Sequence, residues 1–129
     1  MNLTQSLPQN EHVLGIAERV RKKYPSSKCQ CAIMARDLAM ALTKAGFRVQ
    51  HVQGNFHLDE PGASEFADDD DFENADEYAA NHDWVEIEGK ILDIAADQFR
   101  KYVHDKIPDI VFINYSDPLY LHYEQLGYG

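Results

Sequence analysis

Apolar residues near the start of the chain recur at the spacing of two α-helices. In the first helix they are Val13, Ile16, Ala17 and Val20, and in the second they are Cys31, Met34, Leu38, Ala41 and Leu42. The pattern predicts a first helix that is capped by Asn10 and ends near Tyr24-Pro25. Its last turn would carry the cations Arg21, Lys22 and Lys23. The second helix is predicted to start close to Cys31 and to close at Gly46 with a positive φ.

After Gly46 the pattern favours strands. Residues 47–56 alternate in the manner of a β-strand, and residues 84–94 (WVEIEGKILDI) predict a β-hairpin. The hairpin turn would be Glu88-Gly89, because glycine at the second turn position tolerates a positive φ. Three segments follow: a short helix within 95–106, a strand at 109–115 and an aromatic tail at 120–129. We therefore predict an α+β fold, with N-terminal helices packed on an antiparallel β-sheet.

Composition and charge narrow the class of protein. A length of 129 residues with 44% hydrophobic side chains suits one domain spanning 1–129. Ten of the 22 acidic residues lie between positions 58 and 81, which hold no Lys or Arg, so the remaining twelve acids balance the twelve basic residues. Without a basic cluster, nucleic acid and anionic membrane surfaces are poor partners.

The acidic stretch at 58–81 is predicted to be a long loop or a partly helical lid. The run Asp68 to Asp71 would ordinarily be a solvated loop, and a lid that selects cationic substrates is the sharper alternative. A calcium site is not supported, because the stretch lacks a twelve-residue loop with Gly at position six and Glu at position twelve.

Cysteine usage and hydropathy bear on the compartment. Cys29 and Cys31 are separated by one residue, so a disulfide between them would be strained and would stabilise little. The chain has no apolar run of membrane-spanning length, and its first dozen residues lack a secretory signal. The sequence predicts a cytoplasmic protein.

Three residues have the types and contexts that thiol catalysis requires: Cys31, His82 and Asp93. A helix start favours the reactive thiolate, because backbone N–H groups there are unpaired and the helix dipole is positive. His82 would act as base and acid, held in one tautomer by Asp93. With a Glu88-Gly89 turn, Trp84 faces Asp93, and His82 lies diagonal to Asp93 on the same sheet face.

Two segments carry a family resemblance: KCQCAIMARDLAMALTKAGFRVQHVQG and HDWVEIEGKILDIAADQF. They resemble the transglutaminase-like branch of the papain-like cysteine protease superfamily, whose members place a Cys at a helix start, a His-x-Trp-Val-Glu strand and an Asp on the next strand. The resemblance implies Cys31 as nucleophile, His82 as base and acid, and Asp93 as the orienting carboxylate. Trp84 and Gln98-Phe99 match motif residues of structural character near the site. Gln30 and Ala95 depart from the common pattern, which leaves substrate and reaction open.

In this interpretation, Cys31 attacks an amide, peptide or glutamine carbonyl to form a thioester, which water or an amine then resolves. The protein would be a hydrolase or acyltransferase that needs no cofactor. Its substrate would be a peptide, a protein or a small amide, and a cationic one if the acidic stretch borders the cleft. The backbone N–H of Cys31 would hold the oxyanion, helped by a side chain from Gln30 or Gln98.

Other interpretations compete with this one. Cys31 could be a small buried apolar residue, and Asp93 a solvent-facing strand residue. His57 is the main competitor of His82, although it lacks the Trp-Val-Glu context, and Cys29 is read as a loop thiol or redox neighbour. A catalytically silent module that binds a partner on the same fold is the second hypothesis. A zinc site that uses Cys29 and the three candidate catalytic residues is the third, and a lone Cys-x-Cys pair signals it only weakly.

Overall fold

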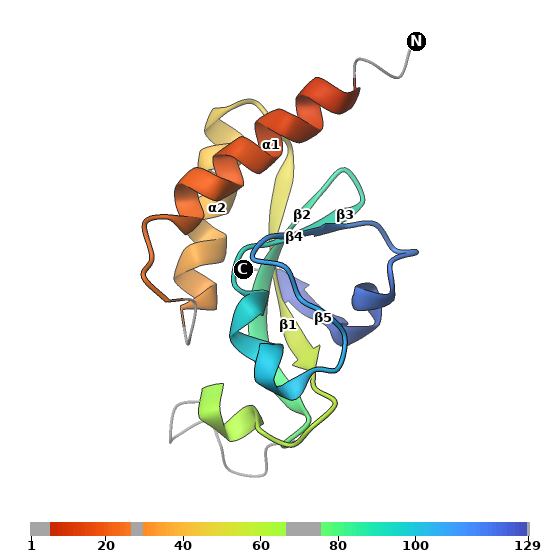
Figure 1. Ribbon diagram of the computed structural model, residues 1–129. Coiled ribbons are helices and arrows are strands. Elements are labelled where there is room, and N and C mark those ends of the chain that lie inside the picture. The colour runs from red at the N-terminus through yellow and green to blue at the C-terminus, as the bar shows by residue number, and fades with distance from the viewer. Residues whose placement is uncertain (1–5, 27–29, 67–75, 129) are drawn as a thin grey trace.

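The chain has an α+β architecture with a five-stranded antiparallel sheet (Figure 1). The computed structural model describes residues 6–26, 30–66 and 76–128. The helices are α1 (Ser6–Arg21) and α2 (Cys31–Lys44), with 3-10 helices η2 (Ala63–Phe66), η4 (Ala96–Tyr102) and η5 (Pro118–His122). The strands are β1 (Val49–His57), β2 (Ala79–Ile87), β3 (Lys90–Asp93), β4 (Val111–Ile113) and β5 (Tyr123–Tyr128), in the sheet order β4-β3-β2-β1-β5. The predicted α+β class is confirmed.

The observed start of α2 agrees with the prediction, whereas the observed start of α1 does not. α1 begins at Ser6 and ends at Arg21, so the prediction that Asn10 caps it was wrong, and Lys22 and Lys23 follow the helix. Asn10 is a residue type that often caps helices, but here it lies inside the helix, four residues after its start. α2 begins at Cys31 as predicted, and Gly46 after it has a φ of 98°. The position of Cys31 at the start of a helix could therefore be predicted from the local sequence.

The hairpin of β2 and β3 forms in the predicted register. Glu88 and Gly89 have φ values of 51° and 75°, which suits a two-residue turn with positive φ at both positions. Ile87 pairs with Lys90 directly across the turn. The predicted helix within 95–106 is the 3-10 helix η4, and the predicted strand at 109–115 contains β4.

The aromatic tail forms an element for which the sequence analysis proposed no strand. η5 leads into β5, which pairs antiparallel with β1 at the sheet edge. Gly54 on β1 permits this close approach: a Cβ there would lie 1.9 Å from the carbonyl oxygen of Glu124 and 2.6 Å from Cη2 of Trp84. Only a residue without a side chain leaves room for both.

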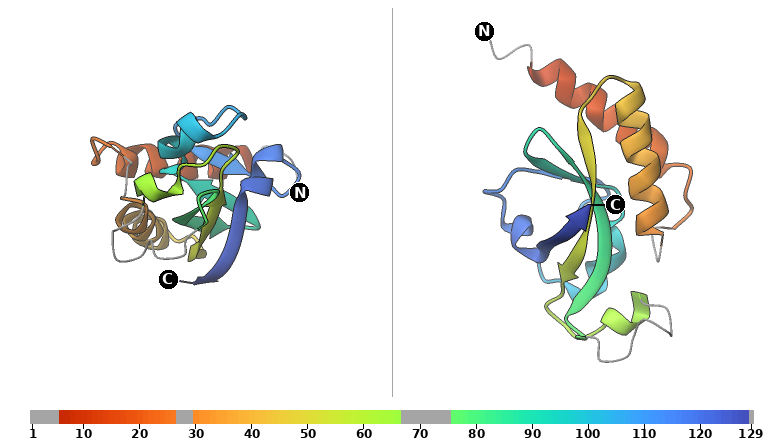
Figure 2. Two further views of the ribbon diagram at one scale, coloured as in Figure 1. Left: turned by 90° about the horizontal axis from the view of Figure 1, so that it is seen from below. Right: turned by 180° about the vertical axis from the view of Figure 1, so that it is seen from behind.

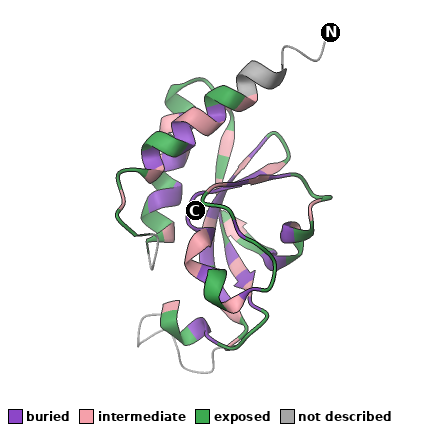
Figure 3. Cartoon of the chain, viewed as in Figure 1, coloured by how far each residue is buried: buried purple, intermediate pink, exposed green. Residues whose placement is uncertain are grey.

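The sheet is buried on both faces. α1 and α2 lie together on one side of it (Figures 1 and 2), where Leu38 and Leu42 pack against Val85 and Leu92. The other face carries a second cluster, which is built from β-strand side chains together with η4 and η5. The buried positions follow the inner sides of the helices and run along the strands (Figure 3). Alternate residues of β2 therefore enter different cores.

The acidic stretch is described only at its two ends. Leu58 donates its N–H to the carbonyl of Tyr78 at 2.8 Å, which joins those ends beside η2. Residues 67–75, including Asp68 to Asp71, lie outside the described residues, and so does Cys29. Across the described ranges, no helix has the length and apolar character that crossing a membrane would require.

Candidate active site

His82 and Asp93 form a buried pair across the β2–β3 hairpin. Nε2 of His82 lies 2.6 Å from Oδ2 of Asp93, and the two side chains are 0% and 1% exposed. Val85 pairs with Leu92, so the same register continued by one residue sets Trp84 opposite Asp93. His82 is then diagonal to Asp93 on the same face, which the sequence analysis predicted. Because a carboxylate can only accept, Nε2 is the donor in this hydrogen bond.

Asp93 accepts two further hydrogen bonds. The backbone N–H of Ala95 donates to Oδ1 at 2.8 Å, and the hydroxyl of Tyr123 donates to Oδ2 at 2.7 Å. Both oxygens of the carboxylate are thus held inside the protein. Tyr123 comes from β5 and was not among the predicted site residues. The aromatic character of the tail was visible, but nothing in the local pattern connected Tyr123 to Asp93.

Aromatic rings enclose the imidazole of His82. Phe99 from η4 and Phe56 from β1 approach it edge-on, at ring-centroid distances of 5.0 Å and 5.8 Å. Trp84, predicted as a structural neighbour, lies 5.9 Å away at a tilt of 33°. Tyr123 completes the surround at 6.3 Å. Water is excluded from the imidazole, so its hydrogen bond to Asp93 acts in a medium of low polarity.

The electrostatics of His82 follow from this enclosure. Burial is the largest influence and lowers its pKa, because a charged ring loses hydration. The charge and hydrogen bond of Asp93 act in the opposite direction, and so do the hydrogen bond and charge of Cys31. Together they outweigh burial and raise the pKa of His82 to about 10. The site therefore favours an imidazolium.

Cys31 reaches the same imidazole from α2. It is the first residue of that helix and is partly exposed, whereas His82 and Asp93 are buried. Among the described residues, Nδ1 of His82 has no hydrogen-bond partner of normal geometry, although Cys31 lies near enough to raise the pKa of the ring. Because Nε2 is committed to Asp93, Nδ1 is the nitrogen left to exchange a proton with the thiol. The structure brings the three candidate catalytic residues together.

The groups predicted to hold an oxyanion differ in their exposure and hydrogen bonding. Gln30 is the N-cap residue of α2, is exposed, and makes no side-chain capping bond. The backbone N–H of Cys31, at the first helical position, belongs to the group that has no partner within the helix. The side-chain amide of Gln98 donates to the carbonyl of Ala95 at 2.9 Å. The Gln30 side chain is therefore exposed at the start of α2, while Gln98 supports the turn that follows Asp93.

The competing residues are placed elsewhere. His57 bonds Glu124 through Nε2 at 2.9 Å, with both side chains about half exposed. Asp93 is buried rather than solvent-facing. Within the described ranges, no three His, Cys, Asp or Glu side chains converge in a way that could hold a metal ion. The zinc hypothesis also needs Cys29, which lies outside those ranges.

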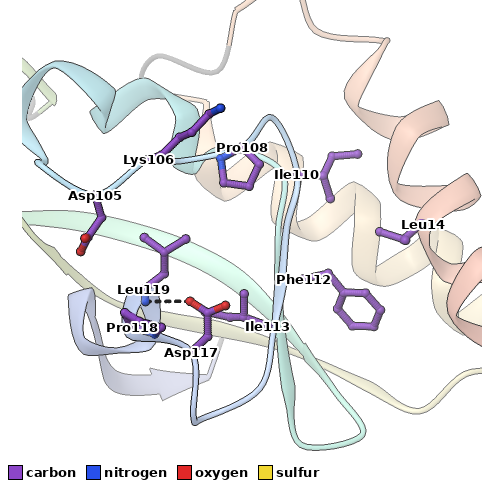
Figure 4. Close-up of a pocket in the computed structure, with 10 residues that line it drawn as sticks. All are labelled: Leu14, Asp105, Lys106, Pro108, Ile110, Phe112, Ile113, Asp117, Pro118 and Leu119. Atoms are coloured by element: carbon purple, nitrogen blue, oxygen red, sulfur yellow. Dashed lines mark hydrogen bonds between the residues drawn. The ribbon is translucent and has the colours of Figure 1, made fainter.

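Two cavities differ in whether they include a candidate catalytic residue. One of about 560 Å³ lies near η5 and β4 (Figure 4), and none of its lining residues belongs to the Cys31, His82 and Asp93 group. A second, of about 340 Å³, includes His82 and Gly54 in its lining, although the imidazole itself has no exposed surface. Of the three candidate residues, Cys31 is the most exposed.

Comparisons of the chain with protein-family models, with curated proteins and with solved structures found no match.

Proposed function

We propose that the protein is a thiol-dependent hydrolase or acyltransferase, which acts on amide or peptide bonds through a thioester on Cys31. The observation that carries the proposal is the arrangement around His82. One ring nitrogen bonds a buried carboxylate at 2.6 Å, and the other is left for a thiol at a helix start. We also propose a papain-like, transglutaminase-like fold, because the elements that carry Cys31, His82 and Asp93 follow one another as α2, β2 and β3.

The proton accounting of the reaction follows from the two ring nitrogens. The Cys31 thiolate attacks the carbonyl carbon, and the C–N bond breaks as the imidazolium gives its Nδ1 proton to the departing amine. Water or a second amine then attacks the thioester and returns a proton to Nδ1, and the thiolate leaves. The Nε2 proton stays on His82 throughout, donated to Asp93, whose negative charge stabilises the imidazolium.

The negative charge on the carbonyl oxygen also needs donors. The N–H of Cys31, which has no partner within α2, supplies one at the positive end of the α2 dipole. The exposed side chain of Gln30 supplies the second. A glutamine carboxamide, a peptide or another small amide fits this chemistry, and a cationic substrate would suit the acidic stretch.

Acyl-enzyme trapping tests the proposal. Purified protein is mixed with p-nitrophenyl acetate, and the burst of p-nitrophenolate is followed together with the mass of each cysteine peptide. We expect an acetyl group on Cys31 that hydroxylamine removes, and loss of the burst in His82→Ala. His57→Ala is the matched control, because its partly exposed pair with Glu124 is separate from Cys31. No adduct on Cys31, or an equal burst in His82→Ala, would contradict the proposal.

Hydrolysis and transfer are then separated with a glutamine-containing peptide. Release of ammonia alone indicates hydrolysis, and covalent incorporation of an added fluorescent primary amine indicates transfer. Both products require the same thioester, so both should disappear in Cys31→Ser.

One observation favours a second candidate, the partner-binding module without catalysis. A groove of about 610 Å³ runs between α2 and β1, with Met40, Arg36 and Lys44 among its lining residues. Met40 is 59% exposed, and Met and Arg are common in protein interfaces. Partner capture that survives Cys31→Ala but fails in Met40→Glu would support this candidate.

A further inference from the structure

We propose that Tyr123 is a positioning residue that orients the Asp93 carboxylate and sets how strongly it holds the His82 proton. The inference rests on the proposed function, because it concerns the same site. It assigns β5 a part in that site, alongside α2, β2 and β3. Nothing in the chain near His82 or Asp93 marks Tyr123 for this role, since it lies 30 residues beyond Asp93.

The hydrogen bonds of Asp93 carry the first step. Oδ2 accepts from Nε2 of His82 at 2.6 Å and from the hydroxyl of Tyr123 at 2.7 Å. The two donors therefore share one oxygen, while Ala95 occupies the other. A donor to a carboxylate oxygen draws charge from it, so the Tyr123 hydroxyl competes with His82 for the same negative charge.

The packing of Tyr123 fixes the direction of its hydroxyl. Its ring meets Trp84 edge-on at 5.0 Å and Phe56 edge-on at 5.1 Å. Gly54 allows the backbone of β5 to approach β1 closely enough for these contacts. The ring cannot swing away without disturbing the cluster around His82.

Tyr123 also stays in one protonation state. Burial raises its pKa well above the ordinary value of a tyrosine, and the charge and hydrogen bond of Asp93 and the charge of Asp117 act in the same direction. The hydroxyl is therefore a neutral donor throughout the range in which a thiol and an imidazole titrate.

Removing the hydroxyl has a predictable sign. With one donor fewer, Oδ2 keeps more charge for the imidazolium, so the pKa of His82 should rise. The ionisable groups that face His82 are Asp93 from β3, Cys31 from α2 and Tyr123 from β5. The other enclosing rings, Phe56, Trp84 and Phe99, carry no titrating proton in this range. A purely structural Tyr123 would lower stability without moving this titration.

The test is an NMR titration of histidine-labelled protein, with the His82 signal identified by its loss in His82→Gln. In Tyr123→Phe we expect the His82 midpoint to move upward by roughly half to one pH unit. Tyr120→Phe is the matched control, because Tyr120 packs against Tyr115 and the edge of the same core. An unchanged or lowered midpoint in Tyr123→Phe would overturn the inference.

A second substitution protects the test from a folding defect. The buried position raises the pKa of the phenol, so a 3-fluorotyrosine at position 123 stays protonated and is a stronger donor, and the His82 midpoint should move downward. Opposite shifts from the two variants indicate competition for Asp93, and shifts of the same sign refute it.

The titration reads the imidazole directly and needs no reactive thiol. If the midpoint moves as expected while Cys31 alkylates as an ordinary thiol, the proposed function fails and the role of Tyr123 stands. If Cys31 is activated but the midpoint does not move, the proposed function stands and the role of Tyr123 is refuted.

Discussion

Two histidine–aspartate pairs each join neighbouring strands at the same contact distance, and they differ in burial and surroundings. Nε2 of His82 lies 2.6 Å from Asp93, and Nε2 of His51 lies 2.6 Å from Asp83. The first pair is 0% and 1% exposed, and the second is 16% and 13% exposed. His51 lines the open groove between α2 and β1, whereas His82 lies inside an aromatic enclosure.

The surroundings of the His82 pair, and not its contact distance, distinguish it chemically from the His51 pair. Asp93 has two additional donors, in Ala95 and Tyr123, and His82 has a thiol beside its second nitrogen. For a pair near the surface, water screens the attraction between imidazolium and carboxylate. A buried pair without water needs all its hydrogen bonds made within the protein, and its geometry is then firmly held.

Removing each carboxylate should give the largest contrast. Asp93→Ala leaves the imidazole, the Tyr123 hydroxyl and the Ala95 N–H without an acceptor, so we expect a loss of about 3–5 kcal/mol in the free energy of unfolding. Asp83→Ala affects a pair that water can reach and should cost about 1 kcal/mol or less. Urea unfolding of both variants measures the difference. Equal losses would show that enclosure does not distinguish the pairs.

The pH dependence of stability should single out His82. Its folded-state pKa is raised from 6.5 to about 10, so the folded protein retains a proton that the unfolded chain releases. This stabilising contribution is complete below about pH 6.5 and is lost as the pH rises through about 10, at up to about 1.4 kcal/mol per pH unit. Chemical denaturation across that range should show the slope in wild type and His51→Gln. The slope should be reduced in His82→Gln, and a persistent slope there would assign it to another group.

A smaller contrast comes from two glycines. In Gly54→Ala the new Cβ meets Glu124 and Trp84, so β5 must shift, at a cost of about 1–3 kcal/mol. The shift moves Tyr123 away from Asp93 and should perturb the NMR signal of His82 more than that of His51. Gly15→Ala is the control, because nothing lies within 4 Å of its Cβ inside α1. It should stabilise the protein by about 0.5–1 kcal/mol in thermal unfolding. A stable Gly54→Ala would contradict the close approach.

The parts of the site that were predictable are those that local chemistry determines. Glu88-Gly89 fixes the turn, the turn fixes the register, and the register sets His82 beside Asp93. The start of α2 at Cys31 was equally local, because apolar spacing and Gly46 bracket the helix.

The parts that were missed depend on contacts between distant segments. β5 pairs with β1 about 70 residues away, and its strand carries exposed residues at most positions, so it shows little alternation. Tyr123 acquires its role only when this pairing sets it against Trp84 and Asp93. The start of α1 was missed for a different reason, because the expected cap Asn10 lies within the helix.

The most direct test of the central claim is the pH dependence of iodoacetamide alkylation at Cys31, read by peptide mass spectrometry. Cys29 serves as the internal reference, and wild type is compared with His82→Ala and His51→Ala. We predict that Cys31 is alkylated at pH values at which Cys29 reacts slowly, that His82→Ala abolishes this reactivity and that His51→Ala retains it. Alkylation of Cys31 with the same pH dependence as Cys29, or alkylation that is insensitive to His82→Ala, would contradict the account.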